Sequence, residues 1–355
     1  MGAGRRSPTP IRNRLGSAGD GVPAGAPSPA GPRANTKMRA SGNGEGMTSS
    51  TISGAAGGLG GVRDRLGLFA DRRFKYLIVW PAILVLLLIG LFPLVYNLVV
   101  SFQNITMLEE DTSFAGLANY ARLFGDLRLW QALGHTAIFT LVALPVELLL
   151  GLAMAQLFLE RMPGRQIFVA LLVLPTVISP IVAGATWRLM FDNRYGPINQ
   201  IVGWFAGEPV PLLWVVDPSL VYPAIVACEI WQWTPFMFLI LLAALSNVDR
   251  SLIEAAAIDG ASFRRIFFRI VLPAIWPVMA IAILIRGLDL VRLFDIVWAL
   301  TRGGPGTMTQ TISIYAYLQG FQQFETSYTA AIAFLVIFLL SVIVMTALRR
   351  MEIAR

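Results

Sequence analysis

Charged residues are scarce in this chain of 355 residues, and the side chains of common catalytic centres are nearly absent. Asp, Glu, Lys and Arg together make up 14% of the sequence, whereas an average soluble domain has roughly 25%. Cys228 is the only cysteine, so no intrachain disulfide can form and a thiolate metal cluster is not expected. His135 is the only histidine and has no partner serine or cysteine in a recognisable nucleophile setting. We therefore expect no catalytic residue, no metal site and no cofactor bound by this chain.

A phosphate-binding loop is also missing. That motif places a lysine directly after a glycine, where the lysine reaches the nucleotide phosphates. The chain has two lysines, Lys37 and Lys75, which follow Thr36 and Phe74. We therefore do not expect this chain to hydrolyse ATP by that route, and an ATP-driven process would need a separate subunit.

Long apolar runs take the place of these features. Hydrophobic residues make up 56% of the chain, and the mean hydropathy is +0.66. No charged residue occurs in 76–108, 166–187 or 326–348, and a helix needs about 20 apolar residues to cross a bilayer. The pattern predicts an all-α membrane protein with six transmembrane helices. Their predicted ranges are 76–103, 135–159, 167–191, 221–245, 274–297 and 328–348.

The segment before the first span has a different composition. Residues 1–62 are rich in Gly, Ala, Ser, Pro and Arg without a hydrophobic period, so we expect a disordered tail ahead of a six-span domain at 63–355. This tail lacks the apolar core of a signal peptide. Met38 and Met47 are alternative translation starts to Met1.

The net charge of +7 does not point to nucleic acid, because much of the excess lies in the tail and the rest lies beside spans. Arginines concentrate on one side of the predicted spans, which the positive-inside rule assigns to the cytoplasm. Both termini are therefore expected in the cytoplasm. The basic residues on that side are Arg63, Arg65, Arg72, Arg73, Lys75, Arg161, Arg165, Arg250, Arg264, Arg265, Arg269, Arg349, Arg350 and Arg355.

The predicted cytoplasmic loop at 246–273 contains its own folding signals. Ser251 and Glu254 stand at the spacing of a capping box, which predicts a short helix. Gly260 is expected to end that helix in a left-handed conformation, and an amphipathic helix on the membrane surface is expected to end at Pro273. From the residues alone, an ordinary loop with well-capped helices and a dock for another protein are equally consistent. The apolar face of the second helix contains Phe263, Ile266, Phe267 and Ile270, opposite Arg264, Arg265 and Arg269.

The same loop resembles the cytoplasmic signature of binding-protein-dependent ABC importer permeases. The family pattern is Glu-Ala-Ala, three residues, Gly, nine residues and then Ile-x-Leu-Pro. The chain matches it at every position, with Glu254, Ala255, Ala256, Gly260, Ile270, Leu272 and Pro273. In that family the first short helix sits in a cleft of the ATPase subunit. The resemblance therefore implies an ATPase-coupling role for these seven residues and for Asp259.

Two outer segments resemble the carbohydrate uptake branch of the same family. Residues 114–120 match the outer-loop motif Phe-x-Gly-Leu-x-Asn-Tyr, and 294–309 resembles the segment after the fifth span in first permeases of the maltose, lactose and glycerol-phosphate type. The residues at 196–199, Gly-Pro-Ile-Asn, are a weaker match. Together the resemblance covers about 75–355.

The resemblance implies a transport subunit of the bacterial inner membrane rather than an enzyme. The implied partners are a second permease, two copies of an ABC ATPase that hold ATP and Mg, and an extracytoplasmic solute-binding protein. The implied cargo is a sugar or polyol. By linkage, loaded binding protein and ATP must favour the same conformation of the permease.

Polar residues inside the predicted spans are candidates for the solute pathway, because ionisable groups at membrane depth are costly and usually face a cavity or a partner. Aromatic faces beside polar groups suit sugar rings, but Trp231 and Trp233 are equally open to packing against lipid or helices. Arg286 and Asp289 are three residues apart and are expected to pair on one helix face. The candidates are Glu229, Trp231, Gln232, Trp233, Arg286 and Asp289.

Three other functions remain open at this stage. A secondary transporter driven by an ion gradient would account for the spans and buried charges but not for the signature loop. A permease of the same family for another small solute, such as glycerol phosphate, an amino acid or phosphate, differs only in its cargo. A membrane-embedded enzyme would need a catalytic set that the sequence does not display.

Overall fold

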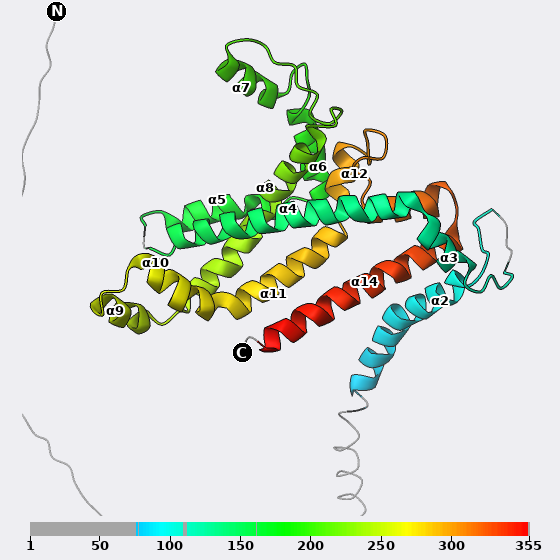
Figure 1. The fold of residues 1–355 in the computed structure, drawn as a ribbon, viewed down its shortest axis with the longest axis horizontal. Coiled ribbons are helices and arrows are strands. Elements are labelled where there is room, and N and C mark those ends of the chain that lie inside the picture. Colours follow the sequence, from blue (N-terminus) through cyan, green and yellow to red (C-terminus); the bar gives the residue numbers. More distant parts are fainter. Residues whose placement is uncertain (1–75, 77, 109–111, 161, 354–355) are drawn as a thin grey trace, which may run out of the picture. The chain divides into compact units, whose positions relative to one another are not determined.

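The computed structural model describes residues 76, 78–108, 112–160 and 162–353, and these residues are helical apart from loops and one isolated bridge between Gln103 and Phe114 (Figure 1). The tail predicted at 1–62, with its alternative starts, lies outside the described residues. The same holds for some of the basic residues behind the topology prediction, namely Arg63, Arg65, Arg72, Arg73, Lys75, Arg161 and Arg355.

The helices follow one another with connections of unequal length, such as the single residue Asp126 and the loop at 207–220. The α-helices are α2 (Phe92–Ser101), α3 (Ala118–Gly125), α4 (Leu127–Leu157), α5 (Arg165–Val177), α6 (Pro180–Met190), α7 (Pro197–Ala206), α8 (Val221–Ser246), α9 (Arg250–Ile258), α10 (Phe263–Ile266), α11 (Leu272–Val291), α12 (Asp295–Leu300), α13 (Ile312–Tyr317) and α14 (Thr326–Ile353). The described part of the chain also has three wider π-helical turns, at Leu87–Leu91, Phe267–Val271 and Leu318–Gln322.

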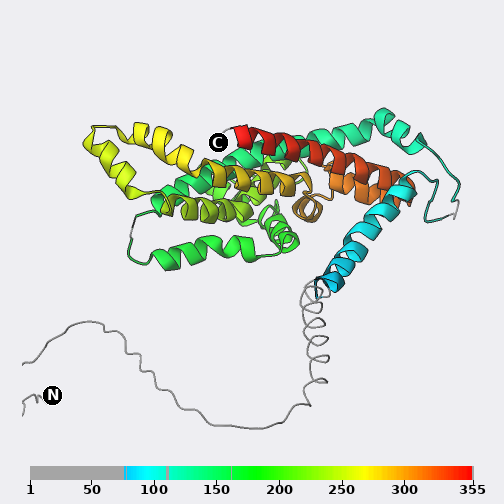
Figure 2. The ribbon, with the colours of Figure 1, turned by 90° about the horizontal axis from the view of Figure 1, so that it is seen from below.

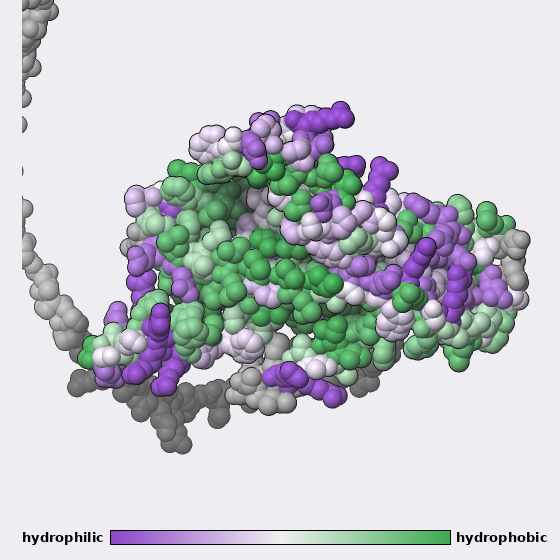
Figure 3. Space-filling model, turned by 45° about the horizontal axis from the view of Figure 1, so that its top comes forward, coloured by the Kyte–Doolittle hydropathy of each residue, from purple (hydrophilic) through white to green (hydrophobic). Residues whose placement is uncertain are grey.

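Among the described residues, five helical stretches are long and apolar enough to cross a membrane, and a bent pair brings the number to six. Apolar side chains dominate the visible face of the bundle, and hydrophilic residues gather toward its ends (Figure 3). This agrees with the predicted all-α architecture. The five stretches are Ile78–Ser101, Leu127–Leu157, Val221–Ser246, Phe263–Val291 and Thr326–Arg350.

The predicted third span at 167–191 is not one straight helix. Helices α5 and α6 meet at an angle of 96° across a break of two residues, Ile178 and Ser179. Both residues are extended, with ψ near 135°, because Pro180 disfavours the helical conformation in the residue before it and has no N–H to continue the hydrogen-bond ladder. The hydropathy of the run indicated a span, and the proline at its middle bends it.

The predicted surface helix ending at Pro273 is also wrong as a separate element. Helix α10, a π-helical turn and α11 run on as one helical stretch from Phe263 to Val291. In the π-helical turn, the Leu272 N–H bonds to the Phe267 carbonyl, five residues back. The wider turn lets the chain pass Pro273, whose ring would otherwise clash with the preceding turn. Phe263 of the expected apolar face is 75% exposed.

Close contact between α4 and α8 builds the centre of the bundle. A Cβ on Gly151 would lie 2.7 Å from the Met237 Cβ and 2.9 Å from the Phe238 backbone nitrogen, so only glycine lets the two backbones approach this closely. Helix α11 packs against both α4 and α8. Views at right angles show α11 and α14 running beside α4 (Figures 1 and 2). This packing places mid-helix side chains of α4, α8 and α11 in one interior.

Candidate functional site

A cluster of three buried charges joins α4, α8 and α11 at the middle of the bundle. Arg286 of α11 donates from Nε to Glu147 Oε2 at 2.8 Å and from Nη2 to Glu147 Oε1 at 3.1 Å. Arg286 Nη2 also donates to Oε1 of Glu229 on α8. The three side chains are at most 2% exposed. We call Glu147, Glu229 and Arg286 the central charge cluster.

This cluster corrects the predicted pairing of Arg286 with Asp289. Asp289 instead accepts from Arg292 Nη2 at 2.8 Å, on the exposed side of α11. A residue pair on one helix is the only partnership that spacing can reveal, whereas Arg286 reaches carboxylates on two other helices. Glu147 is the lone charged residue within the second predicted span, 135–159. A single carboxylate at membrane depth usually has a partner or faces a cavity. This expectation is the sequence signal that could have identified Glu147 as a site residue.

A cavity of about 310 Å³ lies beside the cluster, between α8, α11 and the beginnings of α6 and α12. Glu229 Oε2 has no hydrogen-bond partner among the described residues, although its side chain is almost fully buried. The Trp233 ring covers Arg286, with 4.6 Å between the guanidinium carbon and the ring centroid. Charged, polar and aromatic side chains thus face one space. The charged and aromatic lining consists of Glu229, Trp233, Arg286, Asp289, Arg292, Phe294 and Asp295.

Two other predicted pathway residues lie outside the lining of this cavity. Gln232 donates from Nε2 to the Ile178 carbonyl at 2.8 Å, which satisfies a backbone oxygen freed by the bend between α5 and α6. Trp231 is 39% exposed and makes an edge contact with Trp187, with ring centroids 5.7 Å apart. Gln232 therefore holds the bent span in place, and Trp231 packs against α6.

The second predicted site, the α9 segment (residues 249–261), is a short, mostly exposed helix followed by a turn. Glu254, Ala255 and Asp259 are exposed, and Ile258 is 86% exposed. Ala256 instead faces the bundle, where it packs with Ile253 on a buried apolar cluster. The segment therefore directs charged and small apolar side chains outward and packs against the bundle through Ile253 and Ala256.

The C-terminal end of α9 agrees with the sequence prediction, and the N-terminal end does not. Gly260 has φ +76°, and the Ala261 N–H bonds to the Ala256 carbonyl at 2.9 Å, so the predicted left-handed stop is confirmed. The predicted capping box is wrong, because Asp249 caps the helix by accepting from the Ser251 N–H at 2.9 Å. These backbone and side-chain hydrogen bonds from Ser251 lower the pKa of Asp249 below its ordinary value.

The remaining matched residues of the signature serve packing and helix geometry. Ile270 and Leu272 are half-buried against the same apolar cluster as Ala256. Pro273 is exposed at the beginning of α11. The signature thus combines an exposed helix, α9, with half-buried residues at the beginning of the helical stretch that continues into α11.

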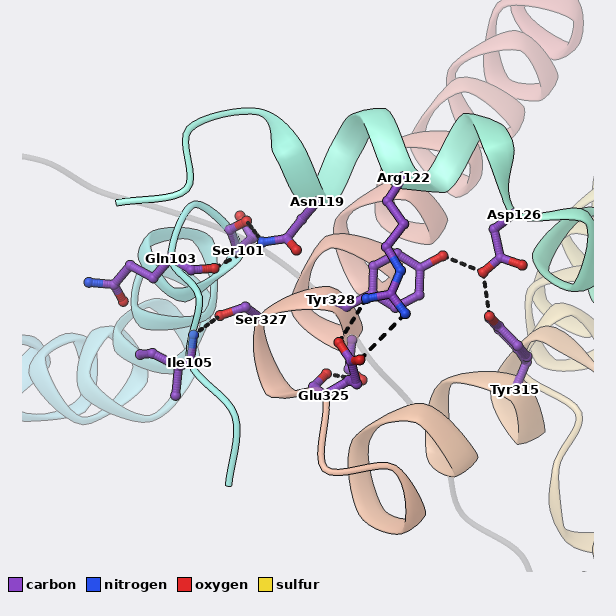
Figure 4. Close-up of polar contacts among 11 residues, drawn as sticks. Ser101, Gln103, Ile105, Asn119, Arg122, Asp126, Tyr315, Glu325, Ser327 and Tyr328 are labelled. Carbon is purple, nitrogen blue, oxygen red and sulfur yellow. Dashed lines mark hydrogen bonds and ion pairs between the residues drawn. The ribbon is translucent and has the colours of Figure 1, made fainter. Parts of the chain in front are cut away.

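The outer-loop motif at 114–120 ties the end of α2 to α3 (Figure 4). Asn119 Nδ2 donates to the backbone carbonyls of Ser101 at 3.0 Å and Gln103 at 2.9 Å. The Tyr120 hydroxyl shares a 2.8 Å hydrogen bond with Ser101 Oγ. The motif residues Asn119 and Tyr120 therefore act as structural anchors for the C-terminal end of the first span.

A carboxylate and two tyrosines connect α4, α13 and α14 at the same end (Figure 4). Asp126 accepts from the hydroxyls of Tyr315 and Tyr328 and from the Leu129 N–H at 3.2 Å. Burial raises the pKa of Asp126, but the hydrogen bonds from Tyr315 and Tyr328 outweigh burial, and the net pKa lies below its ordinary value. Sequence reasoning did not single out Asp126, whose partners lie far along the chain.

Comparison with known proteins gives a family match over most of the helical bundle. Residues 147–352 match the family described as binding-protein-dependent transport system inner membrane component. Over 249 residues the chain is 34% identical to the trehalose/maltose transport system permease protein MalF of Thermococcus litoralis, covering 70% of this chain and 84% of the relative. It is 33% identical to the trehalose transport system permease protein SugA of Mycobacterium tuberculosis, covering 75% and 85%.

A further relative and a solved structure extend the comparison. The sulfoquinovosyl glycerol transport system permease protein SmoG of Agrobacterium fabrum is 32% identical over 77% of this chain and 88% of its own. A chain in the crystal structure of a bacterial alginate ABC transporter, in complex with a periplasmic protein that holds an alginate pentasaccharide, has a TM-score of 0.69 at 24% identity. That alignment covers 80% of this chain and 96% of the other, and it supports the fold. This chain belongs to the family of binding-protein-dependent transport system inner membrane components, the permeases of ABC importers.

Proposed function

We propose that this chain forms part of the translocation pathway for a sugar or polyol that an extracytoplasmic binding protein delivers. The observation that carries the proposal is the polar cavity beside the central charge cluster, inside an otherwise apolar bundle. Relatives named for trehalose, maltose and sulfoquinovosyl glycerol support the class of solute. A cavity of about 310 Å³ is also at the lower end of the range typical of small-molecule sites.

The cavity offers the two kinds of contact that a sugar ring uses. The Trp233 ring supplies an aromatic face for the apolar C–H side of a sugar, and the unpartnered Glu229 Oε2 can accept a hydrogen bond from a hydroxyl. Arg286 holds the other oxygen of Glu229, so the free oxygen stays directed by a fixed partner. Glu229, Trp233, Arg286 and Asp289 are the proposed solute-contacting residues.

The proposed link to ATP is the outward surface of the α9 segment. Its exposed Glu254, Ala255 and Ile258 form a compact surface without an ion pair among the described residues, which suits insertion into a cleft of a separate ATPase. Closure of two ATPase copies that hold ATP and Mg would move α9. The continuous helix from Phe263 to Val291 would carry that movement to Arg286 in the cluster.

The proposal sets both termini and the α9 segment on the cytoplasmic side. Arg264, Arg265 and Arg269 follow α9 in the chain, and α14 runs toward the side of the bundle where α9 lies (Figures 1 and 2). An excess of arginine on one side is typical of cytoplasmic flanks. A second permease would complete the pathway, because the most apolar stretch of the first span is unburied within this chain.

The test combines purification with uptake. The full chain is purified from its own membrane in mild detergent, and we expect a second permease and an ABC ATPase to co-purify. Uptake of radiolabelled trehalose, maltose and glycerol 3-phosphate is then measured in cells with and without the chain. Loss of uptake with vanadate but not with an uncoupler supports the proposal. Uptake abolished only by the uncoupler would establish an ion-coupled transporter, and uptake of glycerol 3-phosphate alone would establish the other cargo.

A further inference from the structure

A second cavity, of about 340 Å³, lies between α11 and α14, with α4 beneath it, and it is not part of the proposed solute pathway. Its walls are apolar side chains except for Thr140 and Arg350. The Thr140 hydroxyl already donates to the Thr136 carbonyl at 2.8 Å. An occupant therefore needs no hydrogen-bonding groups along the length of this cavity. We call the cavity the α11–α14 groove.

The groove runs along one part of the bilayer depth. Its α14 wall extends from Leu340 to Arg350, which is ~15 Å at ~1.5 Å per helical residue. The hydrocarbon core of a bilayer is about 30 Å thick, so this wall matches one leaflet. Ile343 on α14 is 51% exposed and Trp276 on α11 is 43% exposed. The groove is thus open to the surrounding lipid, and its α14 wall is about as long as one leaflet of the hydrocarbon core is thick.

One mouth of the groove has the chemistry of a headgroup site. Arg350 lines that mouth together with Trp276, and no ion pair with a described side chain involves Arg350. Tryptophan is enriched at the level of lipid headgroups. Basic pockets between membrane helices bind anionic headgroups on the cytoplasmic side, which is where the proposed topology places Arg350.

We propose that the α11–α14 groove binds a phospholipid with an anionic headgroup. One acyl chain lies between α11 and α14, and the headgroup phosphate accepts hydrogen bonds from the Arg350 guanidinium. Ala347 and Gly287 line the groove, and their small size leaves room for the chain. The bound lipid fills the space between α11, which contributes Arg286 to the central charge cluster, and the last span.

The test counts lipids that stay bound to the full chain. The protein is equilibrated with equal amounts of dioleoyl phosphatidylglycerol and dioleoyl phosphatidylcholine in mild detergent, and native mass spectrometry measures each retained lipid. We expect phosphatidylglycerol to be retained over phosphatidylcholine by about fivefold, the factor for one basic contact at the headgroup level. Arg350→Gln removes this preference, and Arg350→Lys keeps most of it.

Matched variants separate the groove from general surface charge. Arg349→Gln removes the same charge from the neighbouring position, which does not line the groove, and keeps the preference. Ala347→Phe fills the groove and lowers retention of both lipids. Met345 is 57% exposed and does not line the groove, so Met345→Phe leaves retention unchanged. Thermal unfolding of each variant in detergent confirms that it is folded.

Three results would overturn the inference. The first is an equal loss of preference in Arg349→Gln and Arg350→Gln. The second is unchanged lipid retention in a folded Ala347→Phe variant. The third is photo-cross-linking of Ala347→Cys, labelled on its thiol with a benzophenone reagent, to a helix of a co-purified permease, with no retained lipid, which would assign the groove to a protein partner.

Discussion

The α9 segment and the central charge cluster are built from interactions of opposite range. In α9 the cap and the stop come from residues within a few positions of each other, such as Asp249 with Ser251 and Gly260 with Ala257. In the cluster, Arg286 joins Glu147 and Glu229 across 139 and 57 positions of sequence. The first region is exposed and the second is buried.

This difference predicts how each region responds to substitution. A buried charge that loses its partner is strongly destabilising, so changes in the cluster should reduce both stability and transport. An exposed helix contributes few buried contacts, so changes on the outer surface of α9 should reduce transport alone. The comparison would fail if the two regions affected stability and transport in the same ratio.

The largest effect is expected from Arg286→Met. This variant leaves Glu147 and Glu229 as two buried carboxylates without a cation, and unpaired buried charges cost roughly 3–5 kcal/mol. We expect the free energy of unfolding in detergent, measured with denaturant, to fall by about that amount. The matched control is Arg292→Met, whose arginine side chain is 67% exposed and pairs with Asp289 at the surface. An equal loss of stability in both variants would contradict a special role for the buried cluster.

A smaller effect on stability is expected from Gly260→Val. The residue is in the left-handed region at φ +76°, and a Cβ added there would meet no other atom within 4 Å, so the cost is backbone strain of about 1–2 kcal/mol. We expect normal insertion and loss of uptake, because the turn that orients α9 changes. Uptake and the amount of protein in the membrane are measured together. Normal uptake by a well-inserted variant would argue against the coupling role of α9.

A still smaller effect on stability, which depends on pH, is expected from substitution of Asp126, which lies outside the spans. The pKa of Asp126 is lowered in the folded protein. Its contribution to stability is therefore fully present above the ordinary carboxyl pKa of about 3.9 and is lost as the pH falls through the lower pKa of the folded state. In a comparison of thermal unfolding between pH 7 and pH 3, wild type should lose more stability than Asp126→Asn. Parallel pH profiles would show that the Tyr315 and Tyr328 bonds do not favour the carboxylate.

The smallest effect on stability is expected from Glu254→Ala. Glu254 is exposed, and the capping role that its spacing suggested belongs to Asp249. Alanine is also a better helix former than glutamate. The unfolding free energy of Glu254→Ala should therefore match that of wild type, and thermal unfolding of the two purified proteins checks this. A clear loss of stability would show that Glu254 has a structural role in α9.

The sequence was sufficient for features that depend on composition or on near neighbours. Apolar runs located the spans, and Gly260 located the end of α9. It was insufficient where a choice depends on distant partners. The break at Pro180 divides a predicted span into two helices at 96°. Gln232 donates a hydrogen bond to the Ile178 carbonyl, which this break leaves without a helical partner.

The same limit applies to the candidate site. Glu229 and Arg286 were identifiable because charges are rare at membrane depth, but their partnership with Glu147 needed the packing of α4 against α8 and α11. Asp249 was overlooked as a cap because Ser251 and Glu254 fitted a known spacing. The two wrong predictions, the Arg286–Asp289 pair and the Ser251–Glu254 capping box, both joined residues of one helix. In the folded chain a different residue fills each role.

The most direct test of the account is ATP-driven uptake by Glu254→Ala. The chain and its co-purified subunits are reconstituted in vesicles, and uptake of the labelled solute that wild type transports is measured at equal protein content. The exposed neighbour Ser251→Ala is the control. We predict that Glu254→Ala, with unchanged thermal stability, loses most ATP-driven uptake and that Ser251→Ala keeps it. Full uptake by Glu254→Ala would contradict the claim that the α9 surface couples an ATPase to the central pathway.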